Sequence, residues 1–176
     1  GKLIIQNGSL QLSNSSLGII GATAKMDAFY KNEGTQKAYF DYKINASEFD
    51  IKRAYNEIKM FREIVTAAES AEGIVGLNYS IKGVLNNQME PVMPSLEGSG
   101  TLSVKKVKMK GFKLLNVVSA KTENPDIKDP DISKVDIKST IKNNIVTIER
   151  FKFKVAGFRL RFEGQTSLDG KLNLKM

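Results

Sequence analysis

The side chains that most often perform catalysis are missing from this sequence, which contains no His and no Cys among its 176 residues. Without them the chain lacks the commonest general base, the thiolate nucleophile and the usual ligands of zinc and iron–sulfur clusters. Its serines, lysines and carboxylates occur without a recognisable activating context. The sequence therefore predicts a protein that is not an enzyme and that has no cofactor.

One group of carboxylates has the residue type of a metal site. Asp126, Asp129 and Asp131 lie within the segment KTENPDIKDPDIS, and carboxylate oxygens are preferred ligands of calcium. Their spacing differs from that of an EF-hand loop, and neither the mid-loop glycine nor the closing glutamate is in place. We therefore expect no metal here, and the prolines and polar composition predict an exposed loop over 121–133.

The stretch SLEGSGTLSVKKVKMKGFKLLNVVSA, residues 95–120, suits an amphiphilic ligand better than it suits catalysis. Strand alternation changes register at Lys105-Lys106, so a bulge there would keep the apolar side chains on one face. An acyl chain gains about 0.8 kcal/mol per buried methylene from such a wall, and an anionic headgroup gains less, in a salt-dependent way, from a basic rim. The candidate lipid-facing residues are Leu102, Val104, Val107 and Met109, and the candidate headgroup-facing residues are Lys105, Lys106 and Lys108.

The formal net charge of +8 favours anionic partners, although the lysines are spread along the chain. Lys152 and Lys154, which flank Phe153, are typical of a solvated strand face. Nucleic acid is disfavoured, because the chain has no Trp and its aromatic residues occupy apolar strand positions. The sequence contains no run of 18 or more apolar residues that could span a bilayer, and no signal peptide is visible.

Period-two alternation dominates the chain and predicts a meander of antiparallel strands. Apolar residues alternate on both sides of four turn signals, and this indicates hairpins. The turn signals are Asn7-Gly8, Asn32-Glu33-Gly34, Asn143-Asn144 and Asp169-Gly170, with further breaks at Gly157 and Gly164.

Two segments have helical spacing instead. The first begins at Asp50, a plausible N-cap, and extends to Gly73, as one long amphipathic helix or as two short ones broken near Lys59. The second follows Gly111. We therefore expect an α+β domain over 1–176, with a curved antiparallel sheet and helices packed on it. Both ends of the sequence fall within a strand-like alternating pattern, and this favours a piece of a larger protein. The segments 37–72 and 95–122 share an order of strand and helix that suggests a duplicated unit.

The segment from Leu96 to Met176 resembles the C-terminal region of the AsmA-like family of bacterial envelope proteins. The resemblance lies in a glycine-rich lead into a strand, a glycine before a leucine-rich helix, and a closing series of short strands. Lys105-Lys106 and Asn143-Asn144 depart from it, because they lack the glycine expected at such turns. The matching positions are Gly98, Gly100, Gly111, Gly164, Asp169 and Gly170.

This resemblance implies a periplasmic domain, anchored to the inner membrane by a segment outside this sequence. It further implies a role in outer-membrane assembly or lipid homeostasis, through binding or transfer of phospholipid or another anionic lipid along an apolar β-groove. Other envelope proteins are the further partners that it implies. The alternative is a structural scaffold or protein-interaction domain without a ligand, in which helices close the apolar face.

Overall fold

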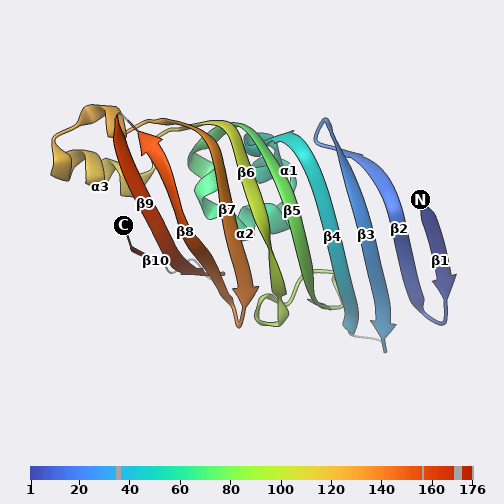
Figure 1. The fold of residues 1–176 in the computed structure, drawn as a ribbon. Helices are drawn as coiled ribbons and strands as arrows, with labels where there is room; N and C mark the ends of the chain where they lie inside the picture. Colours follow the sequence, from blue (N-terminus) through green and yellow to red (C-terminus); the bar gives the residue numbers. More distant parts are fainter. Residues whose placement is uncertain (35–36, 156, 169–171, 176) are drawn as a thin grey trace.

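The computed structural model describes residues 1–34, 37–155, 157–168 and 172–175. Within them, ten strands form one curved, open antiparallel sheet in which spatial order equals chain order (Figure 1). This arrangement confirms the predicted α+β fold with an antiparallel meander. The strands are β1 Lys2–Gln6, β2 Ser9–Ile19, β3 Ala22–Glu33, β4 Lys37–Asp50, β5 Ala71–Leu85, β6 Glu97–Met109, β7 Asp131–Lys142, β8 Ile145–Val155, β9 Phe158–Ser167 and β10 Leu172–Lys175.

The helices lie on one side of this sheet. In Figure 1, α1 and α2 lie behind the middle strands, and α3 lies at the end of the sheet near β9. All three contribute buried side chains to one apolar cluster that includes residues of β3 to β8. The helical segments are α1 Ile51–Glu57, α2 Lys59–Ile64, α3 Lys113–Thr122 and the short 3-10 segments η1 Thr66–Ser70, η2 Met93–Ser95 and η3 Pro125–Ile127.

The register of the strands gives the sheet two chemically different faces. Residues directly opposite each other in neighbouring strands share a face, and side chains alternate between faces along each strand. One transverse row is apolar throughout: Ala24, Ala46, Leu77, Leu102 and Ile137. We call the face that carries this row the covered face, because the helices pack on it, and the opposite face the polar face.

A bulge at Lys105 keeps β6 in phase with this pattern. Ile74 of β5 pairs with Lys106, whereas the next residue, Val75, pairs with Val104, so Lys105 is the extra residue. The predicted register step is thereby confirmed. A comparable shift in β4, between Ala46 and Phe49, precedes α1. Bulges increase local twist and re-aim the residues that follow them, so both strand-to-helix segments begin from a strand of this kind.

The predicted helix over 50–72 is broken, and its predicted end is wrong. The Asp50 carboxylate accepts a hydrogen bond from the Arg53 backbone N–H at 2.8 Å, which confirms the N-cap. Ile58 has an extended backbone and separates α1 from α2, close to the break anticipated near Lys59. Gly73 is no helix stop: it lies inside β5, with φ of 137° and no room for a Cβ against the Lys106 carbonyl oxygen.

The predicted turns at Asn7-Gly8 and Asn143-Asn144 are confirmed, whereas the predicted break at Gly164 is wrong, because Gly164 lies inside β9 and pairs with Ile148. The turn predicted at Asn32-Glu33-Gly34 continues into residues outside the described ones. Asn143 and Asn144 both have positive φ, as do Asn7 and Gly8, and paired positive φ values are the signature of tight hairpin turns. The predicted Asp169-Gly170 turn lies outside the described residues. The expected exposed loop over 121–133 is wrong in its middle, because Ile127 in η3 is only 1% exposed and packs into the main apolar cluster.

Candidate lipid-facing surface

The four apolar residues proposed as a lipid wall share the covered face of β6, but helices close most of that face. Val104, Val107 and Met109 are 7%, 3% and 8% exposed, and Leu102 packs against the same cluster. The cluster also contains Ala54 of α1 and residues of α2 and α3. The predicted common face exists, and in this structure it forms part of the protein core.

The three lysines proposed as a basic rim are exposed. Lys106 and Lys108 alternate with buried Val107, so their side chains leave the strand on its polar face. Lys105 is the bulge residue between them and Val104. The structure therefore does not bring the wall and the lysines to one surface, since the sheet separates them.

An apolar surface that is open to solvent lies instead at the β1 end of the covered face. Leu3 pairs with Leu12, and Ile5 pairs with Leu10, so these four side chains continue the apolar face onto the edge strand. Leu3 is 55% exposed and Ile5 is 71% exposed. Leu17, further along β2, is also exposed. We call these five residues the apolar ledge: Leu3, Ile5, Leu10, Leu12 and Leu17.

The ledge borders a part of the covered face that is closed by α2 and the loop after β5. Met60 and Ile64 of α2, like Tyr30 and Tyr42 of the sheet, pack against a second buried cluster, in which Phe40 is fully buried. Burial and the neighbouring Tyr30 hydroxyl raise the pKa of the Tyr42 side chain. The ledge is therefore continuous with a buried apolar interior, since Tyr30 pairs directly with Leu10.

We call α2 and the loop after β5 the cover. One polar contact joins these two parts of the cover, and a second joins the loop to the sheet. Lys59 Nζ of α2 lies 2.7 Å from Glu90 Oε1 in the loop after β5, and this contact raises the pKa of Lys59 and lowers that of Glu90. The Tyr30 hydroxyl donates to the Met89 sulfur at 3.8 Å. Both contacts are on the surface, so the cover is attached by weak interactions at this border.

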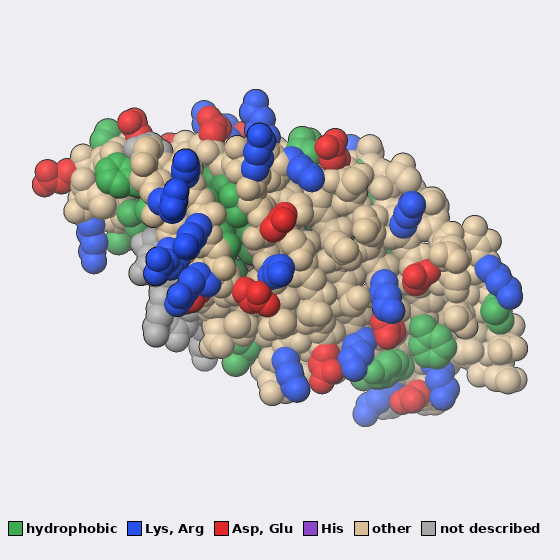
Figure 2. Space-filling model, in the orientation of Figure 1, with side chains coloured by type: hydrophobic (Ala, Val, Ile, Leu, Met, Phe, Trp, Pro, Cys, Tyr) green, Lys and Arg blue, Asp and Glu red, His purple; other side chains and the backbone are tan. Residues whose placement is uncertain are grey.

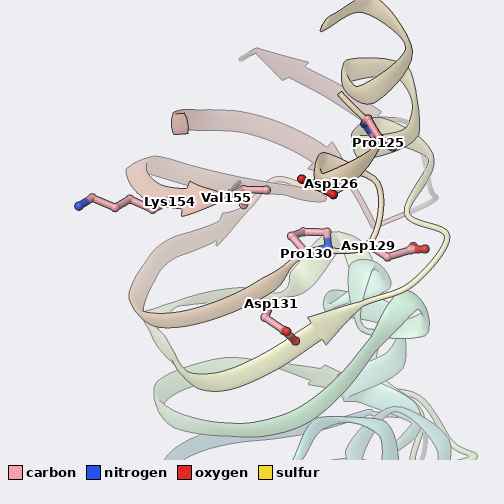
Figure 3. A pocket seen from close by; sticks show the side chains of 7 residues that line it. All are labelled: Pro125, Asp126, Asp129, Pro130, Asp131, Lys154 and Val155. Carbon is pink, nitrogen blue, oxygen red and sulfur yellow. The ribbon is translucent and has the colours of Figure 1, made fainter. Parts of the chain in front are cut away.

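The aspartates considered for calcium line an open cavity of about 520 Å³, together with Lys154 and Val155. Asp129 accepts a hydrogen bond from the Gly111 backbone N–H at 2.9 Å. Figure 3 shows that the carboxylates of Asp126, Asp129 and Asp131 point in different directions. Over the described part of the chain, no three His, Cys, Asp or Glu side chains are grouped to hold a metal ion.

Comparison of the chain with known protein families, with curated proteins and with solved structures finds no match. No helix in the described residues is long and apolar enough to cross a membrane.

Sequence reasoning missed the ledge as a site. Alternation at Leu3 and Ile5 predicts one arm of a hairpin with an apolar face, without showing what covers that face. The signal in the sequence is the alternation of apolar residues in β1 and β2, which continues the covered face onto these strands.

Proposed function

We propose that this domain binds an acyl chain of a phospholipid or another anionic lipid on the apolar ledge, and that it performs no catalysis. The observation that carries the proposal is a gradient of exposure along one row of the covered face. Phe40 is fully buried, Tyr30 and Leu10 are partly buried, and Ile5 is 71% exposed, although each pairs directly with the next. An apolar surface of this kind, continuous with a core, suits an apolar ligand.

The free energy available on the ledge is that of transfer from water. Each methylene of an acyl chain that becomes buried contributes about 0.8 kcal/mol, and Leu3 and Ile5 lose further exposed area when covered. The headgroup would remain outside the sheet, where the chain's net charge of +8 favours an anion in a salt-dependent way. The ledge would therefore supply the affinity for the acyl chain, and the positive charge of the protein would supply the preference for anionic headgroups.

The setting we propose is the bacterial envelope, on the resemblance of Leu96–Met176 to AsmA-like proteins. The domain would lie in the periplasm, with an inner-membrane anchor outside these residues, and would serve outer-membrane assembly or lipid homeostasis. The curved antiparallel sheet with one apolar face is compatible with that role.

A second candidate is a ligand-free scaffold or protein-interaction domain. It is favoured by β1, which among the described strands pairs with β2 and lies at the edge of the sheet, where it presents one row of backbone N–H and C=O groups. Such an edge can add a strand from another protein. Residues of the partner protein that lie beside the added strand would then cover Leu3 and Ile5 in place of a lipid.

The test is uptake of a fluorescent phospholipid by the purified protein, combined with mass spectrometry of its organic extract. The double variant Leu3→Ser/Ile5→Ser should lose uptake. Ile74→Ser/Ile145→Ser is the matched control, because both residues are 38% exposed and belong to the polar face. Equal uptake by the two variants, or an extract free of lipid together with no uptake by the unchanged protein, would favour the scaffold.

A further inference from the structure

The hairpin of β8 and β9 carries four cations in two directly opposed pairs. Lys152 pairs with Arg161, and Lys154 pairs with Arg159. All four are exposed, and they alternate with apolar residues such as Phe153 that face the core. Figure 2 shows Lys and Arg side chains gathered over β8 and β9. We call these four residues the cation array: Lys152, Lys154, Arg159 and Arg161.

Opposed like charges on neighbouring strands are unfavourable, because each raises the electrostatic energy of the other. Elsewhere the sheet places an acid opposite a cation: Lys82 lies 3.2 Å from Glu97, and Arg150 lies 2.7 Å from Glu163. No ion pair found among the described residues involves a member of the cation array. The array is therefore a concentration of positive charge that the fold does not neutralise.

The group of acids that shares a cavity with Lys154 does not neutralise the array either. Lys154 shares a cavity with Asp126, Asp129 and Asp131, but Figure 3 shows its side chain extending away from all three. Asp129 already accepts the Gly111 backbone N–H. The ammonium group of Lys154 is thus directed to solvent on the polar face.

An exposed aromatic side chain lies at the tip of the same hairpin. Phe158 is 49% exposed and follows Gly157, whose φ of 82° belongs to the turn between β8 and β9. Phe158 pairs with Val155, so the next pair inward is Lys154 with Arg159. Val117, which is 53% exposed, lies on α3 at the same end of the molecule (Figure 1). Phe158 therefore stands at the tip on the covered face, and Lys154 and Arg159 of the next pair leave the polar face, so only at the tip of the hairpin can one surface meet both.

We propose that the β8–β9 hairpin docks tip-first on the anionic surface of a lipid bilayer. Phe158 enters the interface between headgroups and acyl chains, and Lys154 and Arg159 contact anionic headgroups. Lys152 and Arg161 lie two residues further back, about 7 Å along the strands, and their long side chains reach the same layer. This separation is below the Debye length of about 10 Å at 0.1 M salt, so all four cations act together.

This proposal goes beyond the binding of single lipids and does not depend on it. The apolar ledge is at the β1 end of the sheet and the hairpin is near the opposite end, as Figure 1 shows. Single-stranded nucleic acid fits the array less well. Stacking platforms need aromatic rings exposed among the cations, whereas Phe151, Phe153 and Phe162 pack on the covered face.

The experiment is co-sedimentation of the whole chain with vesicles of phosphatidylcholine alone and of phosphatidylcholine with phosphatidylglycerol, at low and high salt. We expect binding to the anionic vesicles only, weakened by salt. Replacing all four array residues with Gln should weaken it by roughly two to three orders of magnitude, since each cation near a membrane contributes about fivefold. Phe158→Ser should weaken it while preserving the salt dependence.

The matched control replaces Lys2, Lys25, Lys31 and Lys43 with Gln, which changes the net charge equally on exposed residues of β1, β3 and β4. The control should bind anionic vesicles nearly as well as the unchanged protein. Equal losses in the two variants would overturn the proposal, because net charge alone would then explain binding. A single-stranded oligonucleotide that binds as tightly as the vesicles, with no effect of Phe158→Ser, would overturn it in favour of nucleic acid. Leu3→Ser/Ile5→Ser should leave vesicle binding unchanged, which separates this result from the fate of the ledge.

Discussion

The hydroxyl of Tyr79 on β5 lies 3.1 Å from the Ser139 hydroxyl on β7, with the whole of β6 between the two strands. The tyrosine ring crosses β6 above Gly98 and Gly100, where a Cβ would contact the ring. Two of the glycines in the motif that suggested an envelope family therefore have a local packing role. They leave the space through which one side chain connects alternate strands.

Gly100→Val should destabilise the protein, because the new side chain would overlap the Tyr79 ring and the Asn78 carbonyl oxygen. Overpacking of this kind typically lowers the free energy of unfolding by about 1 to 3 kcal/mol. Urea denaturation would measure this loss. Gly18→Ala is the control, because nothing lies within 4 Å of a Cβ at that position of β2. A Gly100→Val protein as stable as the control would show that the ring does not occupy this space.

Tyrosine ionisation should reduce stability at high pH. Burial raises the pKa of Tyr79 above the ordinary 10.0, against a smaller opposing effect of its hydrogen bond to Ser139, and burial also raises the pKa of Tyr42. The folded state favours the neutral phenols, so this stabilisation is complete below the unfolded pKa and is lost as pH rises through the folded pKa. Phenolate absorbance should contain a late-titrating component. That component should shrink in Tyr79→Phe and Tyr42→Phe, and its persistence in both would contradict the assignment.

Phe153 and Lys154 should respond oppositely to an introduced carboxylate. Phe153 is 8% exposed in the main cluster, so Phe153→Asp forfeits about 1.5 to 3 kcal/mol of transfer free energy and also buries a charge. Lys154→Glu, on the polar face opposite Arg159, should be neutral or slightly stabilising. Thermal denaturation of the two variants distinguishes them, and equal melting temperatures would mean that the faces of β8 are assigned wrongly.

Asp50→Ala should lower stability by about 0.5 to 2 kcal/mol, because α1 loses the carboxylate that accepts the Arg53 backbone N–H. Asp50→Asn should retain most of the stability, since an amide oxygen can accept the same bond. Chemical denaturation with both variants tests the cap. Comparable losses in Ala and Asn would indicate that the charge of Asp50, and not the hydrogen bond, is what matters.

A photo-crosslinking residue should distinguish the ledge from the proposed wall. At Ile5, which is 71% exposed, it should capture lipid in cells or in vesicle mixtures; at Met109, which is 8% exposed, it should react only with protein. The adducts are identified by mass spectrometry. Lipid captured at Met109 and not at Ile5 would mean that the helices move away and that the wall on β6 is the ligand surface.

The difference between the wall and the ledge shows which features of the structure can be predicted from the sequence and which cannot. The bulge at Lys105 was predictable, since the phase of alternation changes on either side of it. So was the cap at Asp50, a local signal. Burial of Val107 beneath helices was not, because it depends on where α1 and α3 cross the sheet. The cation array also required the register of β8 and β9: pairing of Val155 with Phe158 beside the turn sets Lys152 opposite Arg161.

The chain-order sheet has a consequence for how the molecule forms. Each described strand pairs with its neighbours in the sequence, so most pairs can assemble by closing a short loop, whereas β4–β5 and β6–β7 close over the segments that carry the helices. Structure can spread outward from any of the short hairpins. Such a sheet is nearly one-dimensional, like an array of repeats, and its stability is a sum over neighbours. Adding or losing an outer hairpin would then change its length without disturbing the pairing of the rest. Evolution could therefore adjust the span of this protein by hairpin units.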